Sequence, residues 1–178
     1  MKELVNRLLK QKPAFEYRVI KGLASDEERS LMMSNVASVL PELNSGDPDG
    51  DMVIADLLNI LSYAGDASPS YKDLIARYLY GPGVWSAIMA LSVLCYFYKL
   101  TTNYAQEISQ LMRGVRWDPE YNAQEFATSV AATFLRKESD PILLRTLIDI
   151  VEDRTIPEEP RTNAQSALVA ALGLNDVN

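Results

Sequence analysis

The sequence contains no histidine and only one cysteine among its 178 residues. Histidine is the commonest general base, so its absence excludes Ser-His-Asp and Cys-His arrangements and any imidazole metal ligand. The single Cys95 cannot form a disulfide within one chain, and its apolar neighbours favour a buried, unreactive thiol. We therefore expect no catalytic residue, no bound metal and no cofactor.

Signals for β-strands are also nearly absent. No sustained period-two alternation occurs, and no Asn-Gly or Asp-Gly turn joins β-branched runs. Helix starts recur instead: Ser25 to Glu28 forms a capping box, and Asp118-Pro119 and Asp140-Pro141 place an acid before proline. The pattern predicts an all-α protein with a loop over 41–51 and helices over 2–11, 14–23, 26–40, 52–63, 70–80, 83–99, 102–114, 119–137, 140–152 and 158–172.

The longest uncharged run, Val84 to Tyr98, follows the turn Gly81-Pro82-Gly83. A helix that is apolar all round is buried on every side, so we expect the rest of the protein to pack around this one. The alternative is a membrane span, which needs about 20 apolar residues. The run is shorter than that and ends at Lys99, which favours a core helix.

Charge is distributed unevenly along the chain, whose net charge is −7. Residues 1–24 carry six bases and two acids, whereas residues 25–75 carry ten acids and two bases. This acidity argues against a nucleic-acid partner and is compatible with a basic protein partner, or simply with solubility. The start of the sequence lacks the apolar region of a signal peptide, and together with the single cysteine this favours the cytoplasm and no membrane association.

Helix pairs recur in the second half of the sequence. The segment starting at Ser86 aligns with those starting at Asn122 and Asn163, a spacing of about 40 residues that is typical of paired-helix repeats. The last unit resembles a HEAT repeat: Pro141, Asp153 and Arg161 match the proline, the turn aspartate and the basic residue of that pattern. The length of 178 residues predicts a single domain over 1–178. The resemblance covers about 70–173 and implies a short right-handed α-solenoid with three helix pairs over 70–173. Residues 1–63 do not repeat and are expected to form a helical cap.

Other motifs with possible chemistry are weak. The acids of 47–51 resemble the opening of a calcium loop, but Met52 stands where an EF-hand has glycine and Leu58 where it has glutamate. We interpret this segment as an acidic turn. The helical spacing of 119–137 predicts that Gln124, Glu125 and Ser129 face solvent, and that of 158–172 places Leu172 in the buried stripe.

A solenoid presents an extended face lined by the second helix of each pair. With no catalytic constellation, the leading hypothesis is a non-catalytic module that binds a basic protein, for example a bacterial immunity protein that neutralises a nuclease toxin. The acids of 41–56 and 149–159 would rim the face. The candidate partner-binding residues are Trp85, Tyr121, Gln124, Glu125, Asp149, Asp153, Glu158, Glu159, Arg161 and Gln165.

Two alternatives stay open. Some HEAT-like proteins resemble DNA-repair glycosylases, which use tryptophan and aspartate in a cleft; the nearest candidates are Trp85, Trp117 and Asp118. Such an enzyme needs a basic groove, which the acidic composition disfavours. The other alternative is an assembly subunit in which a partner covers part of the apolar helix 84–98.

Overall fold

A computed structural model describes residues 1–65 and 68–174 of the chain, and all regular secondary structure in these ranges is helical. The α-helices are α1 (Lys2–Ile20), α2 (Asp26–Val39), α3 (Pro48–Leu61), α4 (Ser68–Ala76), α5 (Val84–Leu91), α6 (Ala105–Met112), α7 (Asn122–Leu135), α8 (Pro141–Glu152) and α9 (Glu158–Ala171). Short 3₁₀ helices cover Leu40–Glu42, Arg77–Tyr80 and Thr101–Tyr104, and a π-helix covers Ser92–Phe97. The all-α prediction is confirmed.

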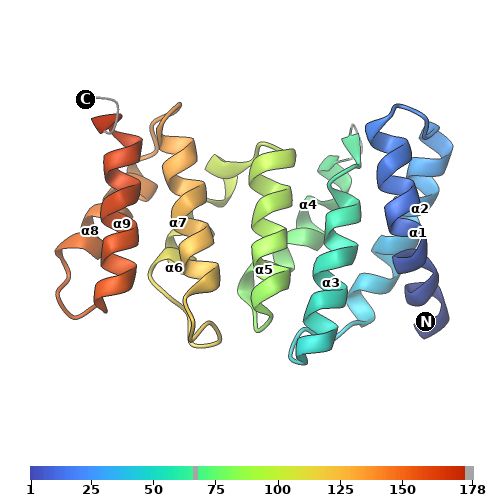
Figure 1. Ribbon diagram of the computed structural model, residues 1–178, viewed down its shortest axis with the longest axis horizontal. Coiled ribbons are helices and arrows are strands. Elements are labelled where there is room, and N and C mark those ends of the chain that lie inside the picture. Colours follow the sequence, from blue (N-terminus) through green and yellow to red (C-terminus); the bar gives the residue numbers. More distant parts are fainter. Residues whose placement is uncertain (66–67, 175–178) are drawn as a thin grey trace. The chain divides into compact units, whose positions relative to one another are not determined.

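The chain forms two compact units, Met1–Lys99 and Leu100–Asn178. In the first unit, α3 packs on α1, α2 and α5, and its side chains Ile54, Leu57 and Leu58 are fully buried. Figure 1 shows α1, α3 and α5 of this unit nearer to the viewer than α2 and α4. Helix α3 is therefore the element around which the first unit is built.

Helix α1 corrects one sequence prediction. Two helices were expected, with a break before Ala14, but one helix continues through Pro13. Proline removes one backbone hydrogen bond from a helix interior. The helix continues because Leu8 and Phe15, seven residues apart on one face, are both buried in the unit.

Helix α3 begins earlier than the sequence predicted. The segment 41–51 was expected to be a loop, yet the helix starts at Pro48. Asp47 is its N-cap, and the side chain accepts a hydrogen bond from Gly50 N at 3.2 Å. Proline at the first helical position lacks only an N–H that has no partner inside the helix, so Asp47-Pro48 is a regular helix start.

The apolar run 84–98 is helical but not buried on every side. Trp85 is 49% exposed and Phe97 is 51% exposed, whereas Ala87, Leu91 and Leu94 are fully buried. Trp85 lies in the first turn of α5, outside the buried stripe. Phe97 turns outward because the π-helix winds more slowly than an α-helix: Tyr98 N donates to Val93 O at 2.9 Å, five residues back.

The second unit contains α6 to α9. Helix α7 packs on α9, α8 packs on α9, and α6 contacts both α7 and α8 (Figure 1). Between α6 and α8, the buried hydroxyls of Ser109 and Thr146 are 2.7 Å apart and hydrogen-bonded. Leu172, expected in the buried stripe of the last helix, is 62% exposed because α9 ends at Ala171.

Across 1–65 and 68–174, no helix combines the length and the hydropathy that crossing a bilayer requires.

Candidate protein-binding face

The start of α5 is held by a side chain from another helix. Asp51, in the first turn of α3, is only 4% exposed. Its Oδ2 accepts a hydrogen bond from Trp85 N at 2.8 Å, and its Oδ1 accepts one from Ser86 N at 2.9 Å. A carboxylate stabilises the N-terminal end of a helix through both the free amides and the helix dipole. The backbone at Trp85 is therefore anchored to α3.

Gly83, the N-cap residue of α5, makes this approach possible. A Cβ atom added at Gly83 would lie 2.0 Å from Asp51 Oδ1 and 2.5 Å from Ser86 Oγ. No other residue leaves room for the carboxylate, so glycine is required for a close approach rather than for an unusual φ. The turn Gly81-Pro82-Gly83 thus separates two helices and also gives the Asp51 carboxylate access to the start of α5.

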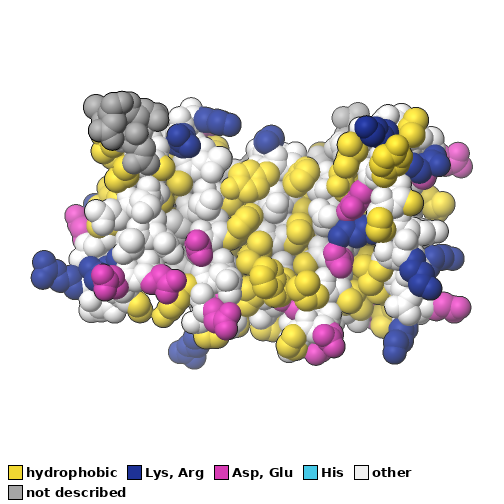
Figure 2. Space-filling view, in the orientation of Figure 1, with side chains coloured by type: hydrophobic (Ala, Val, Ile, Leu, Met, Phe, Trp, Pro, Cys, Tyr) yellow, Lys and Arg dark blue, Asp and Glu magenta, His cyan; other side chains and the backbone are white. Residues whose placement is uncertain are grey.

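An apolar surface lies where α3 and α5 pack on each other. Trp85 of α5 is 49% exposed and Met52, next to Asp51 in α3, is 51% exposed. Figure 2 shows hydrophobic side chains gathered over these two helices. Tryptophan and methionine are enriched at protein–protein contacts, because both offer a large, polarisable contact area. Met52 was not among the candidates predicted from the sequence, because nothing in the sequence shows that this methionine is exposed.

Acids border this surface, which we call the Trp85 face. Asp47 and Asp49 stand at the start of α3 and are exposed, as is Glu42 in the preceding 3₁₀ helix. Asp56 also lies on α3, and its side chain is 49% exposed. The acids of 41–56, which the sequence placed at a rim, therefore belong to the same unit as Trp85.

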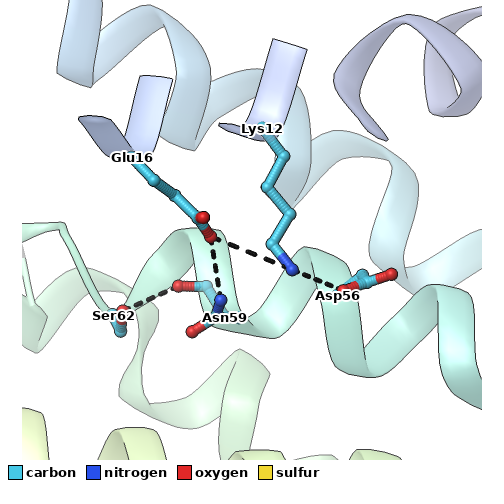
Figure 3. A network of polar contacts seen from close by, with 5 residues as sticks. All are labelled: Lys12, Glu16, Asp56, Asn59 and Ser62. Carbon is cyan, nitrogen blue, oxygen red and sulfur yellow. Dashed lines mark hydrogen bonds and ion pairs between the residues drawn. The ribbon is translucent and has the colours of Figure 1, made fainter. Parts of the chain in front are cut away.

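One of these acids is already paired within the unit. Lys12 Nζ of α1 bonds to Asp56 Oδ1 and lies 3.8 Å from Glu16 Oε1 (Figure 3). The same Glu16 oxygen accepts a hydrogen bond from Asn59 Nδ2 at 2.9 Å. This network ties α1 to α3 and neutralises part of the charge of Asp56. Asp47, Asp49 and Glu42 are the acids that remain for a basic partner.

The other nine candidate residues belong to the second unit. Glu125 of α7 and Gln165, Glu158 and Glu159 of α9 are exposed, as predicted for a contact surface. Glu158 and Glu159 occupy the first turn of α9, where acids also stabilise the helix dipole. Glu158 and Glu159 therefore keep both interpretations, contact and helix stabilisation.

Tyr121 and Arg161 are half-buried and have local roles. Tyr121 is the N-cap residue of α7 and adopts a left-handed conformation with φ of 60°. Arg161 Nε donates a hydrogen bond to Ile156 O at 3.1 Å, which closes the turn before α9. The backbone of Tyr121 and the side chain of Arg161 thus shape the starts of α7 and α9.

The prediction that Gln124 faces solvent is wrong. The residue is 4% exposed, and its Nε2 donates to Met112 O at 2.7 Å. The amide satisfies a carbonyl at the end of α6, which a helical wheel of α7 alone does not reveal. Its Oε1 is buried without a hydrogen-bond partner among the described residues. Gln124 therefore leaves the set of possible contacts.

Asp149 and Asp153 are engaged within the chain. Asp149 lies between Arg113 Nη2 and Arg145 Nε, each 2.8 Å from one of its oxygens. The hydrogen bond from Arg113 is the main cause that lowers the pKa of Asp149, and Arg145 adds to it. Asp153 Oδ1 accepts from the Thr155 side chain and amide at 2.7 and 2.9 Å, which lowers its pKa. The two arginines neutralise much of the charge of Asp149, whereas Asp153 is exposed and keeps its negative charge.

Asp118, the aspartate of the glycosylase alternative, is a capping residue. It is 2% exposed, and its oxygens accept hydrogen bonds from Asn122 N at 2.9 Å and Gln124 N at 3.0 Å. It was expected to cap a helix starting at Pro119, but α7 starts three residues later, after the turn at Tyr121. Both oxygens of Asp118 are occupied, which weighs against a role in bond cleavage.

Among the described residues, no three Cys, Asp or Glu side chains lie together in a group that could hold a metal ion. In the segment that resembles a calcium loop, Asp47 caps α3 and Asp51 caps α5. Cys95 is buried, 4% exposed. Comparisons with protein-family models, curated proteins and solved structures return no match to this chain.

Proposed function

We propose that the protein is a non-catalytic binding module whose Trp85 face takes a basic partner protein. The observation that supports this most is the exposure of Trp85. A large aromatic residue stands half in solvent at the start of an otherwise apolar helix, and Asp51 and Gly83 fix its backbone. Tryptophan dominates the binding energy of many interfaces when its scaffold is rigid.

Charge defines the partner. The chain has a net charge of −7, and three acids beside the Trp85 face are free of ion pairs with other described residues: Glu42, Asp47 and Asp49. A basic protein would be steered to this face, and its binding would weaken as salt screens the charges. A cytoplasmic immunity protein that neutralises a basic toxin is one concrete form of this function.

The architecture we propose for this module is a stack of helix pairs resembling HEAT repeats. Support comes from each unit taken alone: α8 and α9 pack together, and α7 of the preceding pair packs on α9. The pair in the first unit consists of α4 with its 3₁₀ extension and α5 with its π extension. Paired helices of this kind expose the second helix of each pair, which is where Trp85 lies.

The decisive experiment isolates the basic protein that the immobilised chain retains from the source lysate at low salt. Its dissociation constant is then measured with purified Trp85→Ala. We expect about 30-fold weaker binding or more, because a central tryptophan contributes about 2 kcal/mol or more. Phe97→Ala is the matched control, since Phe97 is equally exposed in the same apolar run. Binding that survives Trp85→Ala, or retention of nucleic acid instead of a protein, contradicts the proposal.

A second candidate is an assembly subunit. Trp85 and Phe97 are both about half-exposed in one apolar run, which a second protein chain could cover. Sedimentation over a range of concentrations distinguishes the two candidates. A mass that rises with concentration and falls back in the Phe97→Ala variant favours assembly, whereas a constant mass favours the binding module.

A further inference from the structure

A second surface of the first unit has the opposite charge. Two hollows open along α1 and meet at Gln11, which lines both. One, of about 240 Å³, lies between α1 and α2; the other, of about 670 Å³, follows the first half of α1. Their linings on α1 extend from Leu4 to Arg18, and we call the two hollows together the α1 groove. Fifteen helical residues correspond to about 22 Å.

The floor and one wall of the α1 groove are apolar. Phe15 and Met32 form the floor and are 3% and 8% exposed. Leu31 stands over them and is 63% exposed, although α2 has a fully buried face on its other side, at Val36 and Met33. An exposed leucine beside a hollow with an apolar floor is the geometry in which an incoming apolar side chain is desolvated.

The charged side chains of the α1 groove are three bases and two acids: Arg7, Lys10, Arg18, Glu3 and Glu28. Arg7, Lys10 and Glu3 line its first half and are exposed, and none of the three forms an ion pair with a described residue. At the other end, Arg18 is already paired with Glu28 at 2.8 Å. Two unpaired bases against one unpaired acid leave the groove with a net positive charge, as residues 1–24 have as a whole, with six bases and two acids.

We propose that the α1 groove binds an acidic amphipathic helix of a partner protein. The length of the groove suits about four helical turns, with leucine-like residues against Leu4, Ala14 and Leu31 and carboxylates beside Arg7 and Lys10. This surface differs in location and charge from the Trp85 face, so the proposal does not depend on the proposed function. The module would then connect a basic partner with an acidic one.

The test uses two synthetic, helix-stabilised peptides of about 15 residues with the same leucine spacing. One has glutamate at its other charged positions and the other has lysine. Binding to the full chain is measured by fluorescence anisotropy. We expect the acidic peptide to bind and the basic peptide not to bind there. Leu31→Asp and the double change Arg7→Glu, Lys10→Glu should each weaken binding about tenfold or more.

A matched control separates this site from a general effect of added charge. Leu172→Asp changes a leucine of equal exposure, 62%, in the second unit and should leave the affinity unchanged. Circular dichroism checks that each variant stays folded. The proposal is overturned if Leu31→Asp weakens the basic peptide as much as the acidic one, or if the acidic peptide keeps full affinity for Leu31→Asp. Two other results would also overturn it. In one, the chain binds vesicles with anionic lipids but neither peptide, and Leu31→Asp abolishes the vesicle binding. In the other, the chain self-associates and Leu31→Asp abolishes the self-association.

Discussion

A buried aspartate stabilises one helix start in each unit, and the two do so by different routes. In the first unit, Asp51 of α3 caps α5, and its bonds join residues 34 and 35 positions apart. In the second unit, Asp140 caps its own helix, with Ile142 N and Leu143 N as donors at 2.9 and 3.1 Å. Both carboxylates are buried and each accepts two amides. The same kind of cap thus acts between two helices in the first unit and within one helix in the second.

The difference extends to other polar contacts. In the first unit, Tyr78 and Tyr98 donate to the carbonyls of Leu40 and Leu61, 38 and 37 positions away. In the second unit, most buried polar bonds join positions at most six apart. The exceptions are Ser109 with Thr146, between α6 and α8, and Gln124 with Met112 O, between α7 and α6. Long-range contacts form only when the unit folds, so they contribute more to the free energy of unfolding than local ones.

Gly83→Ala should have the largest effect, because the new Cβ would lie 2.0 Å from Asp51 Oδ1. Expelling the carboxylate combines steric strain with the loss of two hydrogen bonds, which we expect to lower the free energy of unfolding by about 4 kcal/mol. Urea denaturation measures it. The control is Gly46→Ala, whose Cβ would meet the Asn44 side chain at 3.2 Å and Pro82 Cγ at 3.8 Å. Similar losses in both variants would contradict the role of the Gly83 contact.

Asp51→Ala and Asp140→Ala test the comparison directly. We expect a loss of about 3 kcal/mol for Asp51, since two buried amides remain without acceptors and α5 loses its tie to α3. Asp140→Ala should cost about 1 to 2 kcal/mol, the usual range for an N-cap. Amide hydrogen exchange should accelerate at Trp85 and Ser86 in the first variant only. Equal losses would remove the distinction between tertiary and local caps.

Tyr78→Phe probes a long-range bond through its pH dependence. Burial raises the pKa of Tyr78 from 10.0 to about 12, and the neutral hydroxyl donates to Leu40 O at 2.7 Å. The pKa is higher in the folded state, so this stabilisation is complete below pH 10 and is lost as the pH rises towards 12. We expect wild type to exceed the variant by about 1 kcal/mol at neutral pH. The gap in urea midpoints should close above pH 10, and a constant gap would contradict this.

Asp149→Asn should have the smallest effect, because its ion pairs with Arg113 and Arg145 are near solvent. The pKa of Asp149 lies below its ordinary value of 3.8, so its stabilising contribution is present above pH 3.8 and disappears as the pH falls through the folded-state pKa. Thermal unfolding at several pH values should show a small wild-type advantage at neutral pH that vanishes in acid. An advantage that grows in acid would reverse the sign of the argument.

Local signals in the sequence predicted much of the fold. The helix starts predicted at Ser25 and at Asp140-Pro141 are both present, with Glu28 N bonded to Ser25 Oγ at 3.1 Å. The Glu28 carboxylate, expected to reach back to Ser25, pairs with Arg18. These signals succeed because the donor and the acceptor are neighbours in the chain. Asp118 was recognised as a cap, but the turn at Tyr121, which delays the helix, has no comparable sequence signal.

The candidate site was less predictable. Trp85 was identified by residue type, whereas its anchor Asp51 was assigned to an acidic loop, because the two are 34 positions apart and only packing of α3 on α5 unites them. Gln124 failed for a similar reason: its partner, Met112 O, lies at the end of a different helix. The α1 groove was missed because helical spacing does not show which seam between two helices stays open.

The π-helix at Ser92–Phe97 has a consequence for chain length. A stretch wound with hydrogen bonds five residues apart contains one residue more than an α-helix would need for the same turn. Relative to a regular helix it is an insertion that the fold absorbs within a single turn, at the cost of rotating Phe97 outward. A homologue one residue shorter in this segment could keep the same helix path and would present a different side chain to solvent. The number of residues in this segment, as well as their types, thus decides which side chain is exposed to solvent.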